Sequence, residues 1–157
     1  MSASARDSGA PGPAGAPFRF SISTRVEIAD TDLGAVVYYG RYPHFLDRAL
    51  IAYRRQLGIP ALGPDGHLFV VRRLEVEYLS SARFDDELVV WVRTARIGRS
   101  SHTMEFRIDD ASSAAAVLTA REVIVGVSAY EGGRPTRVPT GMRDPISAFE
   151  GPELEQA

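Results

Sequence analysis

The chain has 157 residues, of which 45% are hydrophobic and 24% charged, and this composition predicts one globular domain with its own core. The formal net charge of −2 gives no reason to expect a nucleic acid or an anionic membrane as partner. The sequence has no cysteine, which excludes disulfides and thiolate chemistry, and no lysine, which excludes a Schiff-base lysine. Arginine or backbone N–H groups must therefore hold any anionic ligand.

The two ends of the sequence differ in composition from its middle. Residues 1–17 are rich in Ser, Ala, Gly and Pro and lack the apolar centre of a signal peptide, which predicts a disordered leader. We expect one domain over residues 18–149 and a flexible tail over residues 150–157. No apolar run approaches the ~20 residues that a membrane span needs, so we expect a soluble, cytoplasmic protein.

A first strand is predicted over residues 18–28, and a long helix follows it. The helix begins near Tyr39 or Arg41 and ends at Leu57, before a glycine and a proline. Its apolar side chains recur every three or four residues: Tyr42, Phe45, Leu46, Ala49, Leu50, Tyr53 and Leu57. This broad stripe indicates a helix that other elements cover on more than one side.

Four more strands are predicted after the helix, over residues 68–78, 87–97, 100–108 and 115–130. Hairpin turns are expected at Gly98-Arg99 and over residues 109–113, and a short helix after Pro139. Runs of strands joined by hairpins predict an α+β fold, a five-stranded antiparallel sheet wrapped around one long central helix. In the strand 100–108, His102 falls on the apolar face and is expected to be a hydrogen-bonded core histidine.

A glycine-containing loop with two carboxylates, Asp30 and Asp32, stands directly before the predicted helix. A helix N-terminus offers unpaired N–H groups and a partial positive charge of about half a unit. Those groups can polarise a carbonyl, and an adjacent carboxylate can attack it or activate water. From its spacing alone, Asp32 could either be catalytic or close a turn or cap the helix. For Asp30 a structural role is favoured. Gly34 allows a tight or left-handed turn and close approach to a ligand.

This loop and helix start carry a family resemblance. The residues concerned are Asp30-Thr31-Asp32, Val36-Val37-Tyr38-Tyr39, Tyr42 and Phe45-Leu46-Asp47. They resemble the hot-dog-fold acyl-CoA thioesterases of the 4-hydroxybenzoyl-CoA thioesterase type, including the Tol-Pal-associated branch. Segments 71–78, 82–88 and 96–101 extend the resemblance, which covers about residues 19–139.

The resemblance implies roles for individual residues. Asp32 matches the catalytic carboxylate, and Tyr39 matches the residue whose backbone N–H polarises the thioester carbonyl. Many members of the Tol-Pal-associated branch have His where this chain has Tyr39. Arg99 matches a basic turn position near the nucleotide part of coenzyme A. The resemblance also implies a homodimer joined edge to edge, often paired into a homotetramer, with the active site at the subunit interface.

The sequence therefore predicts hydrolysis of acyl-CoA to a free acid and coenzyme A, without a metal or redox cofactor. The expected substrate-binding residues beside the catalytic pair are Gly34, Val36, Val37, Tyr38, Tyr42 and Arg99, and their apolar members suit an aromatic or fatty acyl group. An acyl-carrier-protein thioester and a non-catalytic acyl-CoA-binding protein are the alternatives. Further arginines that could contact phosphates are Arg72, Arg73, Arg83 and Arg96. For Asp47, the sequence supports a solvent-exposed surface position and a role in the site equally.

Overall fold

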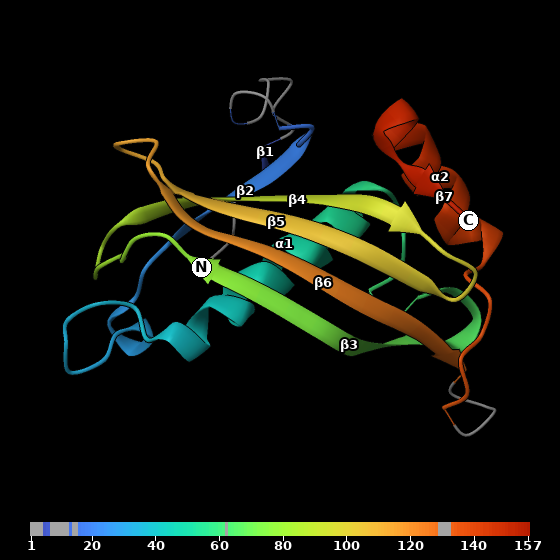
Figure 1. Ribbon diagram of the computed structural model, residues 1–157, viewed down its shortest axis with the longest axis horizontal. Coiled ribbons are helices and arrows are strands. Elements are labelled where there is room, and N and C mark those ends of the chain that lie inside the picture. Colours follow the sequence, from blue (N-terminus) through green and yellow to red (C-terminus); the bar gives the residue numbers. More distant parts are fainter. Residues whose placement is uncertain (1–4, 7–12, 14–15, 62, 129–132) are drawn as a thin grey trace.

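The computed structural model describes residues 5–6, 13, 16–61, 63–128 and 133–157, and in these ranges seven strands form one sheet (Figure 1). The strands are β1 (Ala5–Arg6), β2 (Phe20–Arg25), β3 (His67–Tyr78), β4 (Glu87–Ile97), β5 (Ser101–Asp110), β6 (Ala116–Ser128) and β7 (Glu155–Gln156). The α-helices are α1 (Tyr42–Gln56) and α2 (Thr140–Glu150). Short 3-10 helices are η1 (Ile28–Asp30), η2 (Tyr39–Arg41), η3 (Pro64–Gly66) and η4 (Gly151–Glu153).

The five long strands lie where the alternation pattern predicts them, and α2 follows Pro139 as expected. The predicted count of five is too low, because two strands of two residues extend the sheet. One of them, β1, pairs with β2 and falls in the predicted leader, most of which lies outside the described residues. The other, β7, pairs with β4 in parallel. The predicted end of the strand 115–130 at Tyr130 also lies outside the described residues.

The order of strands in the sheet is β1-β2-β4-β5-β6-β3, so β3 is an edge strand (Figure 1). Tight hairpins join β4, β5 and β6, as the sequence predicts. β3 lies outside this series of hairpins. β3 pairs with β6, and the connection over residues 79–86 carries the chain across to β4, which lies beside β2. This connection therefore passes the end of β2, where the loop leading to α1 begins.

The predicted stripe of α1 is buried between the helix and the sheet. Phe45, Ala49 and Tyr53 are at most 1% exposed and contribute to a core with the inner faces of β2, β4, β5 and β6. Full burial of a side chain as large as that of Phe45 stabilises the fold by roughly 1.5–3 kcal/mol. Leu57 caps the helix and Gly58 follows with a φ of 70°, a conformation that favours glycine. Among the described residues, no helix is both long and apolar enough to cross a membrane.

The segment predicted as a flexible tail makes specific contacts with the sheet. Leu154 packs with Ile97 and Ile146 in a second apolar cluster. The Glu150 side chain is completely buried, and its Oε1 accepts hydrogen bonds from the Tyr53 hydroxyl (2.6 Å) and the Thr94 N–H (2.8 Å). Burial raises the pKa of Glu150. The packed domain thus continues past the predicted boundary at residue 149.

His102 is a core residue, as predicted, but it is not hydrogen-bonded. Its side chain is buried, and neither ring nitrogen has a hydrogen-bond partner within the described residues. Burial and, to a smaller extent, the nearby Arg54 charge lower the pKa of His102 to about 3. The ring is therefore neutral at physiological pH.

Candidate active site

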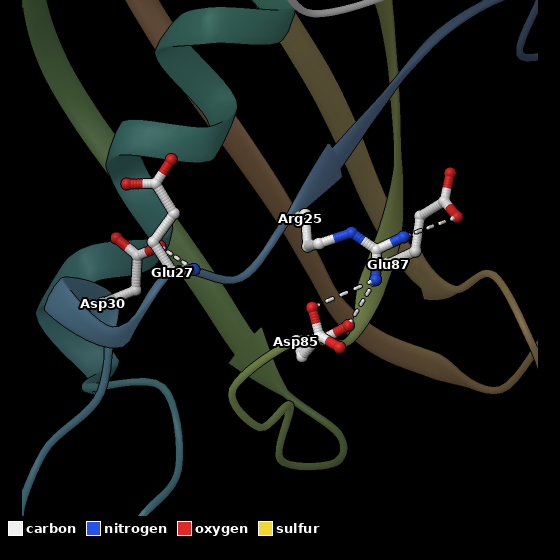
Figure 2. Close-up of polar contacts among 5 residues, drawn as sticks. All are labelled: Arg25, Glu27, Asp30, Asp85 and Glu87. Carbon is white, nitrogen blue, oxygen red and sulfur yellow. Dashed lines mark hydrogen bonds and ion pairs between the residues drawn. The ribbon is translucent and has the colours of Figure 1, made fainter. Parts of the chain in front are cut away.

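Asp30 fixes the loop between β2 and α1. Its carboxylate accepts hydrogen bonds from the Glu27 N–H (2.9 Å) and from the Arg41 Nε (2.8 Å), and Figure 2 shows the first of these contacts. Its backbone carbonyl accepts the Tyr38 N–H (2.9 Å), which closes the loop at its base. The Asp30 side chain is only 7% exposed. Asp30 therefore has the structural role that the sequence favours, and it holds the start of the helix against the loop.

Asp32 lies at the turn of this loop, with an exposed side chain. Its Oδ1 accepts the Gly34 N–H at 2.7 Å, and no other hydrogen bond to this carboxylate is found among the described residues. The left-handed residue of the turn is Ala35 (φ 58°) and not Gly34, so of the two expected backbone roles the glycine has only the tight turn, which the Ala35 N–H closes on the Asp32 carbonyl (3.0 Å). A Cβ at Gly34 would lie 3.0 Å from Asp32 Oδ1, so glycine leaves room for the carboxylate. The turn thus fixes one oxygen and leaves the other exposed.

A pocket of about 380 Å³ opens beside Asp32. It is lined by Asp32, Val36, Val37, Tyr39, Tyr42, Tyr78, Leu79, Ser80 and Ser81. The first five belong to the predicted site, whereas the last four come from the end of β3 and the connection to β4. Sequence reasoning missed those four because the route of this connection depends on the strand order.

Several contacts bring this connection to the loop. The Val37 N–H donates to the Ala82 carbonyl (2.8 Å), and the Tyr78 hydroxyl donates to the Tyr39 carbonyl (3.0 Å). On the other side of the connection, Arg25 at the end of β2 contacts the Asp85 carbonyl (2.7 Å) and the carboxylates of Asp85 and Glu87 (Figure 2). Figure 2 also shows these residues beside the Asp30 loop. The pocket wall is therefore held by two segments far apart in sequence.

The backbone N–H of Tyr39 lies at the start of η2, which continues directly into α1. As the first residue of this helical segment it has no intrahelical acceptor, and no hydrogen bond found between described residues uses it. Tyr39 lines the same pocket as Asp32. Asp32 and Tyr39 thus line one pocket, and Tyr39 stands at the first position of the helical segment. The neighbouring Tyr38 packs its ring on Tyr39 (centroids 4.6 Å apart) and does not line the pocket.

The structure does not bring Arg99 to this pocket within one chain. Arg99 lies in the β4–β5 turn, whereas the Asp32 loop follows the end of β2 that pairs with Glu87. The ten residue steps from Glu87 to Ile97 along β4 correspond to about 33 Å. Arg83, another predicted phosphate contact, forms an isolated β-bridge with Val36, which lines the pocket. Sequence patterns alone do not rank these two arginines by their distance from Asp32.

A second pocket of about 340 Å³ lies between α1 and the strands β3 and β6. It is lined by Asp47, Leu50, Ile51, Arg54, Phe69, Val71, Glu122 and Ile124. Arg54 and Glu122 are each only 6% exposed. Burial, reinforced by the Asp47 charge and opposed by Arg54, raises the pKa of Glu122 to about 7. In the sequence, Arg54 and Glu122 each interrupt an apolar pattern and carry no signal of a binding role.

An antiparallel sheet folded over one long helix, with an aspartate loop at the start of that helix, defines the hot-dog fold of thioesterases. The family model of the thioesterase superfamily matches residues 34–117. The chain is also 36% identical to the acyl-CoA thioesterase YbgC of Haemophilus influenzae over 92 residues, covering 57% of this chain and 68% of that protein. The chain therefore belongs to the thioesterase superfamily.

Solved structures agree with this assignment. A thioesterase of Thermus thermophilus, solved with coenzyme A and Zn, has a TM-score of 0.73 and 32% identity, covering 88% of this chain and 98% of that chain. A mutant 4-hydroxybenzoyl-CoA thioesterase in complex with 4-hydroxybenzoyl-CoA has a TM-score of 0.74 at 20% identity, covering 81% and 97%. The second similarity shows the fold alone.

Proposed function

We propose that this protein is a cytoplasmic acyl-CoA thioesterase in which Asp32 is the reacting carboxylate and the Tyr39 N–H is the oxyanion contact. The observation that carries the proposal is one pocket lined by both residues, between the start of the helix and the β3–β4 connection. Membership of the thioesterase superfamily and the similarity to acyl-CoA thioesterases support the reaction.

Two routes fit this arrangement. In the first, the exposed Asp32 oxygen attacks the thioester carbonyl carbon, coenzyme A leaves as the thiolate, and water then hydrolyses the mixed anhydride. In the second, Asp32 takes a proton from water, and the resulting hydroxide attacks the same carbon. In both routes negative charge develops on the carbonyl oxygen, where the Tyr39 N–H stabilises it. The products are a free acid and coenzyme A.

The wall of the pocket favours an apolar acyl group. Val36, Val37, Tyr42 and Tyr78 face the same space, and the rings of Tyr42 and Tyr78 meet edge to face with centroids 5.7 Å apart. Aromatic rings and branched side chains suit an aromatic or fatty acyl group. We expect the coenzyme A part to extend past the exposed rim, where Arg83 lies.

We further propose that two copies pair through β3. This edge strand of twelve residues exposes Leu68 (38%), Val70 (49%) and Leu74 (36%), and an exposed apolar edge is a template for another strand. Light scattering should give a mass of two chains, or of four if dimers pair again. Val70→Lys should shift this mass to one chain, whereas the exposed Ile28→Lys should not. A wild-type monomer would contradict the proposal.

Thiol release tests the proposed reaction. We expect the wild-type protein to release coenzyme A from at least one ester in a panel of short-chain, long-chain, benzoyl- and phenylacetyl-CoA. Binding of these esters without release would instead indicate a non-catalytic acyl-CoA-binding protein. Release from acyl-carrier-protein thioesters alone would identify the carrier protein as the substrate.

A further inference from the structure

The pocket between α1, β3 and β6 is lined by a buried arginine, Arg54, and a buried glutamate, Glu122. Within the described residues, neither the Arg54 guanidinium nor the Glu122 carboxyl makes a hydrogen bond or an ion pair. Arg54 stacks on Phe69, with its guanidinium carbon 4.0 Å from the ring centroid, and this contact uses none of its N–H donors. Both side chains line the pocket, so a polar group inside it can pair with them in place of water.

The chemistry of the two side chains restricts what that group is. A guanidinium only donates hydrogen bonds, and an ionised carboxylate only accepts them. A hydroxyl does both, so it can accept from Arg54 and donate to Glu122 without adding charge. A carboxylate would be repelled by Glu122 and by Asp47 at the pocket rim, and an ammonium group would be repelled by Arg54.

The position of the pocket indicates which kind of molecule could carry this hydroxyl. Both the Asp32 pocket and this pocket lie between the helical segment and β3, towards opposite ends. The fifteen residues from Tyr39 to Arg54 correspond to about 22 Å along a helix. Leu50, Ile51 and Val71 line the pocket with apolar surface, which suits the methylene groups of a long chain. A second copy paired along β3 would cover its open side.

We propose that this pocket binds the terminal hydroxyl of a long aliphatic acyl chain, with Arg54 donating a hydrogen bond to the hydroxyl oxygen and Glu122 accepting a hydrogen bond from it. The inference rests on the proposed function, because the thioester end of the same chain lies at Asp32. It makes hydroxy-fatty acyl-CoA the substrate class, and it makes Arg54 and Glu122 the residues that determine this specificity.

Calorimetric binding of matched esters tests the inference. Dodecanoyl-CoA and 12-hydroxydodecanoyl-CoA, and the corresponding hexadecanoyl pair, would be titrated into the Asp32→Asn protein, so that no ester is consumed. We expect the hydroxylated ester of at least one pair to bind about tenfold tighter or more, as hydrogen bonds to charged groups warrant. A butanoyl pair should show no such preference, because its hydroxyl is too far from the pocket.

Variants of the two residues make the test specific. Arg54→Leu and Glu122→Val should reduce the ratio of the two affinities to about one. Glu122→Gln should retain part of the preference, since its amide oxygen still accepts a hydrogen bond. Arg55→Leu is the matched control, because Arg55 is the adjacent exposed arginine, and it should keep the full ratio. Thermal unfolding of each variant shows whether it is folded.

Three outcomes would overturn the inference. They are equal affinities for both members of every long pair, an equal loss for both members in the pocket variants, and a preference of the same size in the butanoyl pair. Because the readout is binding, a protein that hydrolyses none of the esters would refute the proposed function and still leave this inference testable.

Discussion

Asp32→Asn is expected to lower kcat for thioester hydrolysis by a hundredfold or more, with a much smaller change in KM. Asparagine has the same shape, and its side-chain oxygen can still accept the Gly34 N–H that holds the turn. The amide can neither attack the thioester nor take a proton from water. General-base or nucleophilic catalysis by one group is worth about 10²–10⁴-fold, so the loss should fall mainly on kcat. Steady-state thiol release with the best ester of the panel measures both constants.

Asp144→Asn provides the matched control for this result. Asp144 is an exposed aspartate on α2, on an element that does not line the Asp32 pocket, so the same chemical change should leave kcat within about twofold. The two variants should also unfold at similar temperatures. Unchanged turnover in Asp32→Asn would show that another group performs the chemistry, even if the reaction itself is confirmed.

The local patterns of the sequence are sufficient to locate α1 and the five long strands. The spacing of Phe45, Ala49 and Tyr53 specifies the buried face of the helix, and the alternation around Phe106 specifies that of β5. These patterns depend on neighbouring residues alone. The position of β3 beside β6 depends on pairing between residues about 50 positions apart, for which the sequence carries no local signal. Because Tyr78 ends β3, its place in the pocket follows from the order of strands in the sheet and not from a local sequence pattern.

The same limit applies to the charged residues. The place of Asp32 before the helix and the family resemblance predict its role, and the structure places it in a pocket with Tyr39. The position of Arg99 in a turn predicts a contact with coenzyme A. The length of β4 places this turn far from the Asp32 pocket of the same chain. Arg54 and Glu122 face one pocket from elements nearly 70 residues apart in sequence. Only the packing of α1 on the sheet brings them together.

Glu122→Gln is expected to make the protein more stable than the wild type at pH 8 and to change its stability little near pH 4.5. Burial, reinforced by the Asp47 charge and opposed by Arg54, raises the pKa of Glu122 from 4.5 to about 7. Between these values the folded protein binds more protons than the unfolded chain, so stability is lost as the pH rises through 7. Above pH 7 the buried charge costs about 1–3 kcal/mol, which a neutral glutamine avoids. Urea unfolding at pH 5 and pH 8 measures the difference.

The surroundings of Glu122 indicate that its carboxylate alone accounts for the predicted loss of stability above pH 7. Its partners across the neighbouring strands, Leu74 and Met104, carry no charge, and the Arg54 guanidinium lowers its pKa without forming an ion pair. Glu153→Gln, at an exposed position, should show no such dependence on pH. A stability gain that is equal at pH 5 and pH 8 would contradict the raised pKa. A gain confined to high pH would show that Glu122 destabilises the fold at that pH, as expected for a residue that serves ligand binding in its pocket.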